Sequence, residues 1–304
     1  MLTPETQLFL EGLKNLNRPP IDQIPVELMR DQLETMITLY GGSRLQNVPH
    51  EDSTLALQKA DKPIKIRSFQ VEAPKGVILY AHGGGWTKGS LDTHHVMCQN
   101  LAQATHSHVI AIAYSLSPEH VYPVALNEIE AVYEWAVTKQ SLPVSVAGDS
   151  AGANLIAGLI VRLNNKQSTL PKGCIFFYPA FDLTCQLESL QEFAEGYMLS
   201  RHSVMYYINN YLGGDLTSAE SPEVSPLWSM KDINFPQTLI IAAEYDPLRD
   251  DSRIAKDILK QKGALKGYLE VPGVIHGFVQ IPSFFPESAK VFEWISKFYS
   301  SENC

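Results

Sequence analysis

Residues 144–154 read Val-Ser-Val-Ala-Gly-Asp-Ser-Ala-Gly-Ala-Asn, and this stretch constrains the fold more than any other part of the chain. It begins with a short apolar run typical of a buried strand, and the proline-free apolar segment 151–163 indicates a helix directly afterwards. Gly148 and Gly152 flank Ser150, so the backbone can turn sharply from strand to helix. The pattern predicts a nucleophile elbow that presents Ser150 Oγ above a sheet, although the pattern is common enough that its context must decide.

The rest of the sequence alternates between short apolar runs and segments with helical character. Continuous apolar strands that alternate with helices indicate a mainly parallel sheet covered by helices on both faces. We therefore expect an α/β fold built on one core. The expected strands are residues 64–71, 77–81, 109–114, 144–147, 174–178, 239–243 and 268–271, and the expected helices are residues 91–104, 124–137, 151–163, 250–261 and 288–299.

Two segments lie outside this alternation, and we expect them to form a helical cap, or lid. The first is the N-terminus, with one helix that Thr3 can cap and a second that starts near Val26 and ends at Gly41. The second is a long insertion after the expected strand at 174–178, with a helix at 200–211. It starts where a parallel strand ends, near the ligand crevice of such folds. The expected cap comprises residues 1–45 and 183–229, and the expected catalytic core comprises residues 46–182 and 230–304.

A glycine-rich loop, His82-Gly-Gly-Gly-Trp86, follows the expected strand at 77–81. Glycines let backbone N–H groups approach the oxyanion of a substrate, where a side chain would block the acyl group. Such a loop is typical of lipases and esterases, in which the N–H of the residue after the nucleophile also contributes. Here that residue is Ala151, at the N-terminus of the expected helix. The alternative is a simple glycine turn that closes a strand.

A serine nucleophile needs a general base, and His276 is the best candidate among nine histidines. It follows the last expected strand, which gives the chain order serine, acid, histidine. For the acid we favour Asp246 over Glu244, because Asp246 precedes a proline and so adopts an extended or turn conformation where a strand ends. Asp250 and Asp251 are expected to cap the following helix instead.

Four other histidines, His94, His95, His106 and His108, lie close together in the sequence, and a metal site is conceivable there. No carboxylate stands at ligand spacing from them, so we expect solvated or core histidines. The sequence therefore predicts no metal site and no organic cofactor.

Five motifs recur in one known family: His82-Gly-Gly-Gly-Trp86, Tyr114-Ser-Leu-Ser-Pro-Glu-His120, Gly148-Asp-Ser-Ala-Gly152, Glu244-Tyr-Asp-Pro-Leu-Arg-Asp-Asp251 and His276-Gly-Phe278. Together they resemble the hormone-sensitive-lipase-like family of α/β-hydrolases, and within it the bacterial acetyl esterases, over about residues 64–278. The resemblance implies an α/β-hydrolase fold with a helical cap, and a structural role for His82 in the glycine loop. It also implies these site residues: Ser150 as nucleophile, His276 as base, Asp246 as orienting acid, and Gly83, Gly84 and Ala151 as donors to the oxyanion.

The chain departs from the family pattern at one point. Many members have Asp-Tyr-Arg where this chain has Ala113-Tyr-Ser115, which removes an ion pair near Pro118 and leaves the partner of Glu119 open. The triad is unaffected. The plant gibberellin receptor is similar in sequence but lacks the catalytic histidine, so the presence of His276 favours an enzyme.

Composition excludes several classes of partner. The formal net charge of −9 argues against nucleic acid or an anionic membrane, since both select for basic surfaces. The N-terminus lacks a basic region leading into an apolar core, and no apolar run approaches the length of a membrane span. We expect a cytoplasmic protein with free thiols, because the cysteines form no framework: Cys98, Cys174, Cys185 and Cys304 lie far apart.

The sequence thus predicts a serine carboxylesterase that cleaves short acyl esters of a small-molecule substrate through an acyl-enzyme. Two alternatives stay open: a non-catalytic, receptor-like ligand-binding protein of the same fold, and an amidase or peptidase with the same triad. A homodimer is one of the oligomeric states that the sequence allows. Four side chains, where they face the pocket, would shorten the acyl site and favour acetyl to hexanoyl groups: Trp86, Tyr178, Met198 and Phe278.

Overall fold

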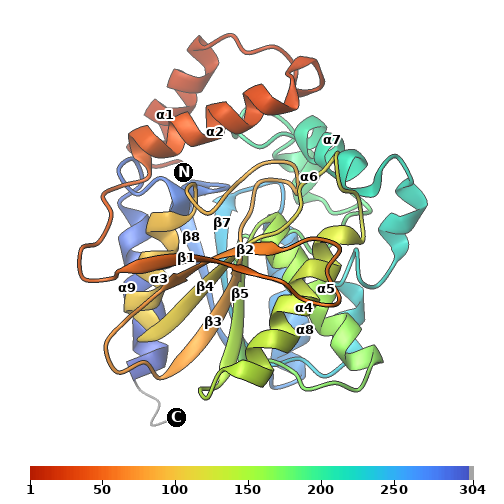
Figure 1. The fold of residues 1–304 in the computed structure, drawn as a ribbon. Helices are drawn as coiled ribbons and strands as arrows, with labels where there is room; N and C mark the ends of the chain where they lie inside the picture. The colour runs from red at the N-terminus through yellow and green to blue at the C-terminus, as the bar shows by residue number, and fades with distance from the viewer. Residues whose placement is uncertain (301–304) are drawn as a thin grey trace.

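A computed structural model describes residues 1–300, and the rest of the chain, Cys304 included, lies outside the described part. The described residues form one eight-stranded sheet with the order β1-β2-β4-β3-β5-β6-β7-β8 (Figure 1). Strands β3 to β8 pair in parallel, while β1 and β2 run antiparallel to their neighbours. The strands are β1 (His50–Leu55), β2 (Ile64–Phe69), β3 (Gly76–Ala81), β4 (Ser107–Ala113), β5 (Val144–Asp149), β6 (Gly173–Phe177), β7 (Gln237–Tyr245) and β8 (Leu265–Ile275).

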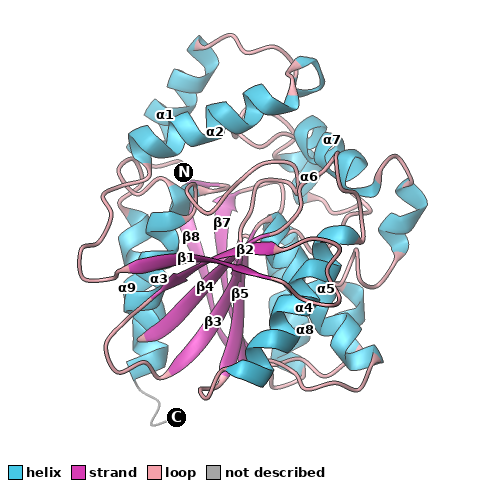
Figure 2. Cartoon of the chain, in the orientation of Figure 1, coloured by secondary structure: helices cyan, strands magenta, loops and turns pink. Residues whose placement is uncertain are grey.

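Helices cover both faces of this sheet, as Figure 2 shows. Successive side chains of a strand point to opposite faces. In β3, Val77 and Leu79 belong to the core cluster under one helical layer, whereas Ile78 and Tyr80 belong to the cluster under the other. The first layer contains α4 (Val124–Lys139), α5 (Ala151–Asn165) and α8 (Arg249–Gln261); the second contains α3 (His95–Thr105) and α9 (Glu287–Ser300). The α/β prediction is therefore confirmed.

The sequence did not indicate strand β1. Its residues, His-Glu-Asp-Ser-Thr-Leu, are exposed apart from a half-buried Leu55, so they lack the apolar run or alternation that marks a strand. Backbone pairing with β2, from His50 opposite Phe69 to Leu55 opposite Ile64, holds this edge strand in place. A strand stabilised by its ladder at a sheet edge leaves little trace in side-chain pattern.

The two N-terminal helices, and helices α6 (Ser189–Glu192) and α7 (Arg201–Leu212) of the insertion, lie near the carboxyl ends of the parallel strands (Figure 1). Thr3 caps α1 (Pro4–Asn15) by accepting a hydrogen bond from the Thr6 N–H, and α2 (Val26–Tyr40) ends at Gly41, both as predicted. The Thr6 hydroxyl also donates to the Gly273 carbonyl, which ties α1 to β8. The other short elements are η1 (Ile21–Gln23), η2 (Leu216–Glu220), η3 (Trp228–Lys231) and η4 (Phe278–Gln280).

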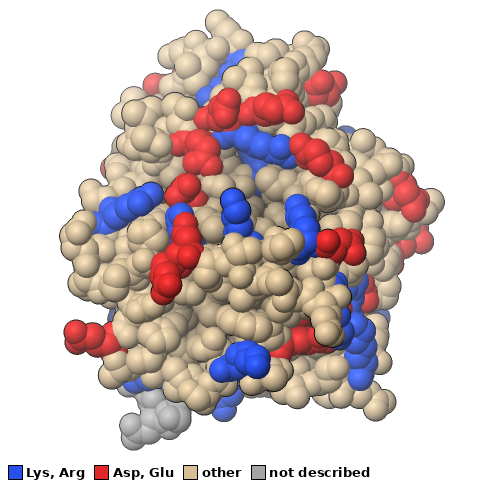
Figure 3. All heavy atoms as spheres, in the orientation of Figure 1, with Lys and Arg blue, Asp and Glu red and all other residues tan. Residues whose placement is uncertain are grey.

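The surface carries both signs of charge. On the face drawn in Figure 3, acidic and basic side chains are interspersed and no broad basic area is present. Among residues 1–300, no helix is both long enough and apolar enough to cross a bilayer.

Candidate active site

Ser150 stands at the turn between β5 and α5. Its φ is 53°, a left-handed conformation that few residues other than glycine adopt, and such strain is concentrated at functional sites. Gly152 explains how the turn fits, because a Cβ atom there would collide with the carbonyl oxygen of Ala81 in the neighbouring strand. The turn therefore lifts Ser150 out of the sheet as the motif predicts.

Two other side chains converge on Ser150 from loops that follow β7 and β8. The Nε2 atom of His276 lies 2.9 Å from Ser150 Oγ, and its Nδ1 atom lies 2.7 Å from Asp246 Oδ2. Asp246 is buried, and its other oxygen accepts a hydrogen bond from the Leu248 N–H at 2.8 Å. The carboxylate thus favours a proton on Nδ1 of the imidazole, which leaves the Nε2 lone pair facing the serine hydroxyl.

The structure does not support Gly83 as an oxyanion donor. Its N–H already donates to Asp149 Oδ1 at 2.7 Å, and Gly83 does not line the cavity that contains Ser150. Gly84 and Gly85 do line that cavity, and within the described part of the chain neither N–H donates a hydrogen bond. The two glycines with free N–H groups at the cavity are therefore one residue further along the chain than the expected pair, and they line the same cavity as Ala151.

Asp149 joins the glycine loop to the elbow. It accepts hydrogen bonds from the Gly83 N–H and, at 2.6 Å, from the Tyr80 hydroxyl, and His94 Nε2 lies 3.3 Å from it. Burial alone would raise the pKa of this carboxyl, but His94 and these hydrogen bonds hold the pKa below its usual value. An ionised Asp149 therefore fixes the glycine loop next to Ser150.

His82 supports the same loop from behind, in agreement with the structural role that the resemblance implies. Its Nδ1 donates to the Gly83 carbonyl at 2.8 Å, and its ring stacks on Tyr114 at 4.3 Å. Burial, with His94 nearby, lowers the pKa of His82 to about 3. The side chain is therefore neutral in the folded protein at any ordinary pH.

This neutral histidine makes stability depend on pH. The unfolded chain binds a proton at His82 below about pH 6.5, whereas the folded chain does so only near pH 3, so its stabilising effect is lost as the pH falls between these values. We expect the His82 contribution to the free energy of unfolding to fall by about 2 kcal/mol from pH 7.5 to pH 5. Urea unfolding at both pH values measures it.

The variant His82→Asn serves as the control, since it keeps a polar side chain but has no group that titrates in this range. The loss of stability between pH 7.5 and pH 5 should be smaller in this variant than in the wild type by about 2 kcal/mol. An identical pH dependence in the two proteins would show that the histidine protonates freely in the folded state.

The cavity above Ser150 has a volume of about 400 Å³ and receives three of the four predicted substrate-contacting residues. Trp86, Tyr178 and Met198 line it, and their φ angles of 55°, 35° and 66° are all positive. The prediction for Phe278 is wrong. Its side chain is fully buried in the core under α3 and α9, and its ring lies edge-on to that of Tyr178, with the ring centroids 6.0 Å apart. It supports a wall residue of the cavity and does not face the substrate.

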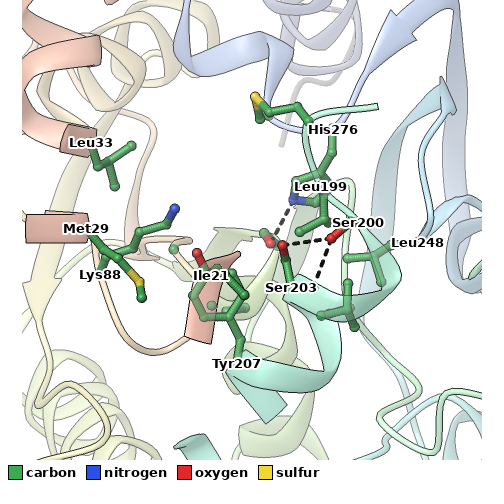
Figure 4. A pocket seen from close by; sticks show the side chains of 18 of the residues that line it. Ile21, Met29, Leu33, Lys88, Leu199, Ser200, Ser203, Tyr207, Leu248 and His276 are labelled. Atoms are coloured by element: carbon green, nitrogen blue, oxygen red, sulfur yellow. Dashed lines mark hydrogen bonds between the residues drawn. The ribbon is translucent and has the colours of Figure 1, made fainter. Parts of the chain in front are cut away.

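Helices and loops distant in the sequence supply much of the cavity wall that the sequence did not reveal. Figure 4 shows Ile21, Met29 and Leu33 from the N-terminal segment opposite Leu199 and Leu248. The ring of Tyr207, from α7, closes one side, and a Cβ atom added to Gly85 would lie 2.5 Å from it. Helical periodicity marks the apolar faces of α2 and α7, but it does not tell against what they pack.

The other candidates from the sequence fall outside the reactive centre. Glu244 accepts a hydrogen bond from the Gly273 N–H, and residues 1–300 contain no cluster of side chains that could hold a metal ion. The expectation for Asp250 and Asp251 is wrong: α8 has Leu248 at its cap position, and both aspartates lie in the first turn. There Asp250 accepts a hydrogen bond from the Ser189 N–H of the insertion, and Asp251 accepts hydrogen bonds from the N–H groups of Phe181 and Asp182, just before the insertion.

The partner of Glu119, which the sequence left open, is Arg30 of α2. Arg30 donates to both carboxylate oxygens of Glu119, at 2.8 and 2.7 Å, and also to the carbonyl oxygens of Thr87 and Ser117. An arginine from the N-terminal helix therefore binds the loop that continues the glycine motif. The sequence could not identify this partner, because the two residues are far apart in the chain.

The chain is similar in sequence to several known proteins. Residues 78–280 match the model of a protein family whose description is "alpha/beta hydrolase fold". An esterase from Acinetobacter venetianus is 32% identical over 250 residues, which cover 79% of this chain and 82% of that protein. An ethyl acetate hydrolase from Pseudomonas putida is 28% identical over 282 residues, 88% of each chain.

Solved structures extend the likeness to nearly the whole chain. An ester hydrolase from the metagenome of Lake Arreo, solved with a bipyridine phosphonate derivative, superimposes with a TM-score of 0.92 at 27% identity and covers 99% of both chains. A hyperthermophilic esterase from the archaeon Pyrobaculum calidifontis gives a TM-score of 0.89 at 28% identity, covering 99% of this chain and 98% of its own.

Proposed function

This chain belongs to the hormone-sensitive-lipase-like family of α/β-hydrolases, and we propose that it cleaves short-chain esters with Ser150, His276 and Asp246 as its catalytic triad. Like the esterases to which it is similar, it is a carboxylic ester hydrolase. The observation that best supports this triad is the 2.9 Å distance between His276 Nε2 and Ser150 Oγ at the cavity.

Acylation starts when Ser150 Oγ attacks the ester carbonyl carbon. His276 Nε2 takes the hydroxyl proton as the new C–O bond forms, and Asp246 stabilises the resulting imidazolium through Nδ1–H. The tetrahedral intermediate collapses when the bond to the alcohol oxygen breaks, and His276 returns the proton to that oxygen. The products of this half-reaction are a free alcohol and an acyl group on Ser150.

Backbone N–H groups stabilise the negative oxygen of the tetrahedral intermediate. We assign this role to Gly84, Gly85 and Ala151, because they face the cavity and the Gly83 N–H is engaged by Asp149. Each preorganised donor of this kind contributes roughly 100- to 1,000-fold in rate. Water then attacks the acyl carbon with His276 as base, releases the acid and restores Ser150.

We propose that residues 1–45 and 183–229 act as a cap over a catalytic core made of residues 46–182 and 230–304. Side chains from both cap segments, such as Met29 and Tyr207, lie in the same cavity as Ser150. A cap in this position would exclude water from the acyl-enzyme and limit the length of the substrate. The alcohol and acyl parts must share one cavity of about 400 Å³, which favours small groups on both sides.

A series of p-nitrophenyl esters tests the preference for short acyl groups. We expect kcat/KM for acetyl to hexanoyl esters to exceed that for the palmitoyl ester by about 100-fold or more, because extra methylenes find no free pocket. The matched p-nitroanilides test the amidase alternative. Equal or faster cleavage of the palmitoyl ester would contradict the short-chain proposal, and efficient cleavage of the anilides would favour an amidase.

A further inference from the structure

Lys88 is one of the few charged residues that line the cavity, together with Arg18, Asp149 and Asp182. It lies just beyond the glycine loop, and its backbone is held there because the Lys88 N–H donates to the Gly84 carbonyl at 3.0 Å. The side chain is half-buried and lines the same cavity as Ser150. Figure 4 shows it extending into the cavity from the side opposite His276. The loop that carries the proposed oxyanion donors thus holds the backbone from which this side chain extends.

This ammonium group has no anionic partner among residues 1–300, where no carboxylate lies within ion-pair distance of Lys88 Nζ. Nζ instead lies over the ring of Tyr207, 5.3 Å from the ring centroid. The ring attracts the cation, but it carries no net negative charge that would neutralise it.

The carboxylates that line the cavity are already engaged elsewhere. Asp149 binds the Gly83 N–H and the Tyr80 hydroxyl, while Asp182 accepts hydrogen bonds from the N–H and hydroxyl of Thr184. Outside the cavity, Glu119 is paired with Arg30. The nearby protein groups therefore leave the charge of Lys88 without compensation inside a cavity whose lining is mainly apolar.

We propose that Lys88 is a specificity residue that binds an anionic group, such as a carboxylate, on the ester substrate. This inference rests on the proposed function, since it concerns the substrate of the same site. An anion next to Lys88 would give the cation a partner in a place shielded from water, where charge-assisted hydrogen bonds are strongest. Lys88 takes no part in bond making, so its effect falls on substrate binding.

Two pairs of esters, alike in size but different in charge, test the proposal and locate the anion. For the acyl side, mono-p-nitrophenyl succinate is compared with p-nitrophenyl pentanoate. For the alcohol side, 4-acetoxybenzoate is compared with 4-methylphenyl acetate. The variant Lys88→Met keeps an unbranched apolar stem and removes the charge, whereas Lys88→Arg keeps the charge. Lys14→Met, at an exposed position of α1 outside the cavity, is the matched control.

We expect Lys88→Met to raise KM for the anionic ester of at least one pair by about 10- to 100-fold, with kcat changed little. The neutral esters should change by less than about 3-fold, Lys88→Arg should keep most of the preference, and Lys14→Met should behave as the wild type. The pair that responds identifies the side that carries the anion.

A change of equal size for neutral and anionic esters, or no change in either pair, would overturn the proposal, because a merely structural lysine gives that result. These outcomes differ from a failure of the proposed function. In that case the wild type would not cleave even the neutral esters, and the inference about Lys88 would fall with it.

Discussion

Replacing Ser150 with alanine is expected to lower kcat for p-nitrophenyl butyrate by a factor on the order of 10⁵ to 10⁶. The variant keeps the cavity, the three N–H donors and the His276–Asp246 pair, but it has no oxygen to form the acyl-enzyme. Residual hydrolysis would come from water activated in the same site. Initial rates over a wide range of enzyme concentration measure the loss.

The fold should survive this substitution. Alanine meets the same backbone strain as serine at a φ of 53°, and the hydrogen bond that is lost is the one to His276. Circular dichroism and the thermal midpoint are therefore expected to be close to those of the wild type. Ser168→Ala, at an exposed loop position, is the matched control and should keep full activity. A Ser150→Ala variant that folds and retains turnover within tenfold of the wild type would refute the assignment of the nucleophile.

Replacing Asp246 with asparagine is expected to reduce kcat by about 10⁴-fold, the cost of presenting the wrong tautomer of the histidine. The Leu248 N–H donates to Asp246 Oδ1, so an asparagine would keep its carbonyl oxygen there and direct its NH₂ group at His276. That NH₂ group would donate to Nδ1 and leave the imidazole proton on Nε2. A protonated Nε2 cannot accept the proton of Ser150.

Glu244→Gln is the natural comparison for this variant. Glu244 lies at the end of the same strand and accepts a hydrogen bond from the Gly273 N–H, but it does not contact His276. We expect its amide variant to lose less than about tenfold in kcat, since that hydrogen bond can be kept. A larger loss in Glu244→Gln than in Asp246→Asn would reverse the roles of the two carboxylates.

The sequence predicted the strand-to-helix turn at Ser150 and the α/β fold because both depend on local pattern. Glycines beside a serine, apolar runs and a helix without proline act over a few residues. His276 and Asp246 could be proposed in the same way, since each follows an apolar strand, and the structure brings both to Ser150. Parallel strands place their carboxyl ends along one edge, which explains the convergence.

The local sequence pattern could not predict which of the glycine N–H groups would be free to bind the oxyanion. Three successive glycines look alike in the sequence, and the choice among them depends on which N–H is already used. Asp149 takes the N–H of Gly83 across a separation of 66 residues. Only the fold reveals that contact, so the free pair, Gly84 and Gly85, could not be identified beforehand.

The other features that the sequence did not predict depend on the direction of side chains and on tertiary packing. Phe278 stands two residues after His276, yet a 3₁₀ turn begins there and its ring points into the core. The polar strand β1 depends on its neighbour for its structure. Ile21, Met29 and Tyr207, from the segments that we propose as a cap, reach the cavity through packing between elements. The sequence indicates the apolar faces of these elements but not the elements against which they pack.

Covalent labelling with a p-nitrophenyl alkylphosphonate tests the central claim most directly. A phosphonate ester mimics the tetrahedral intermediate, and attack by an activated serine would displace p-nitrophenol and leave the phosphonyl group on the nucleophile. We predict release of one equivalent of p-nitrophenol and, by mass spectrometry, one phosphonyl group on the peptide that contains Ser150. The Ser150→Ala variant should take up none. Labelling of a different residue, or equal labelling of the variant, would contradict the account.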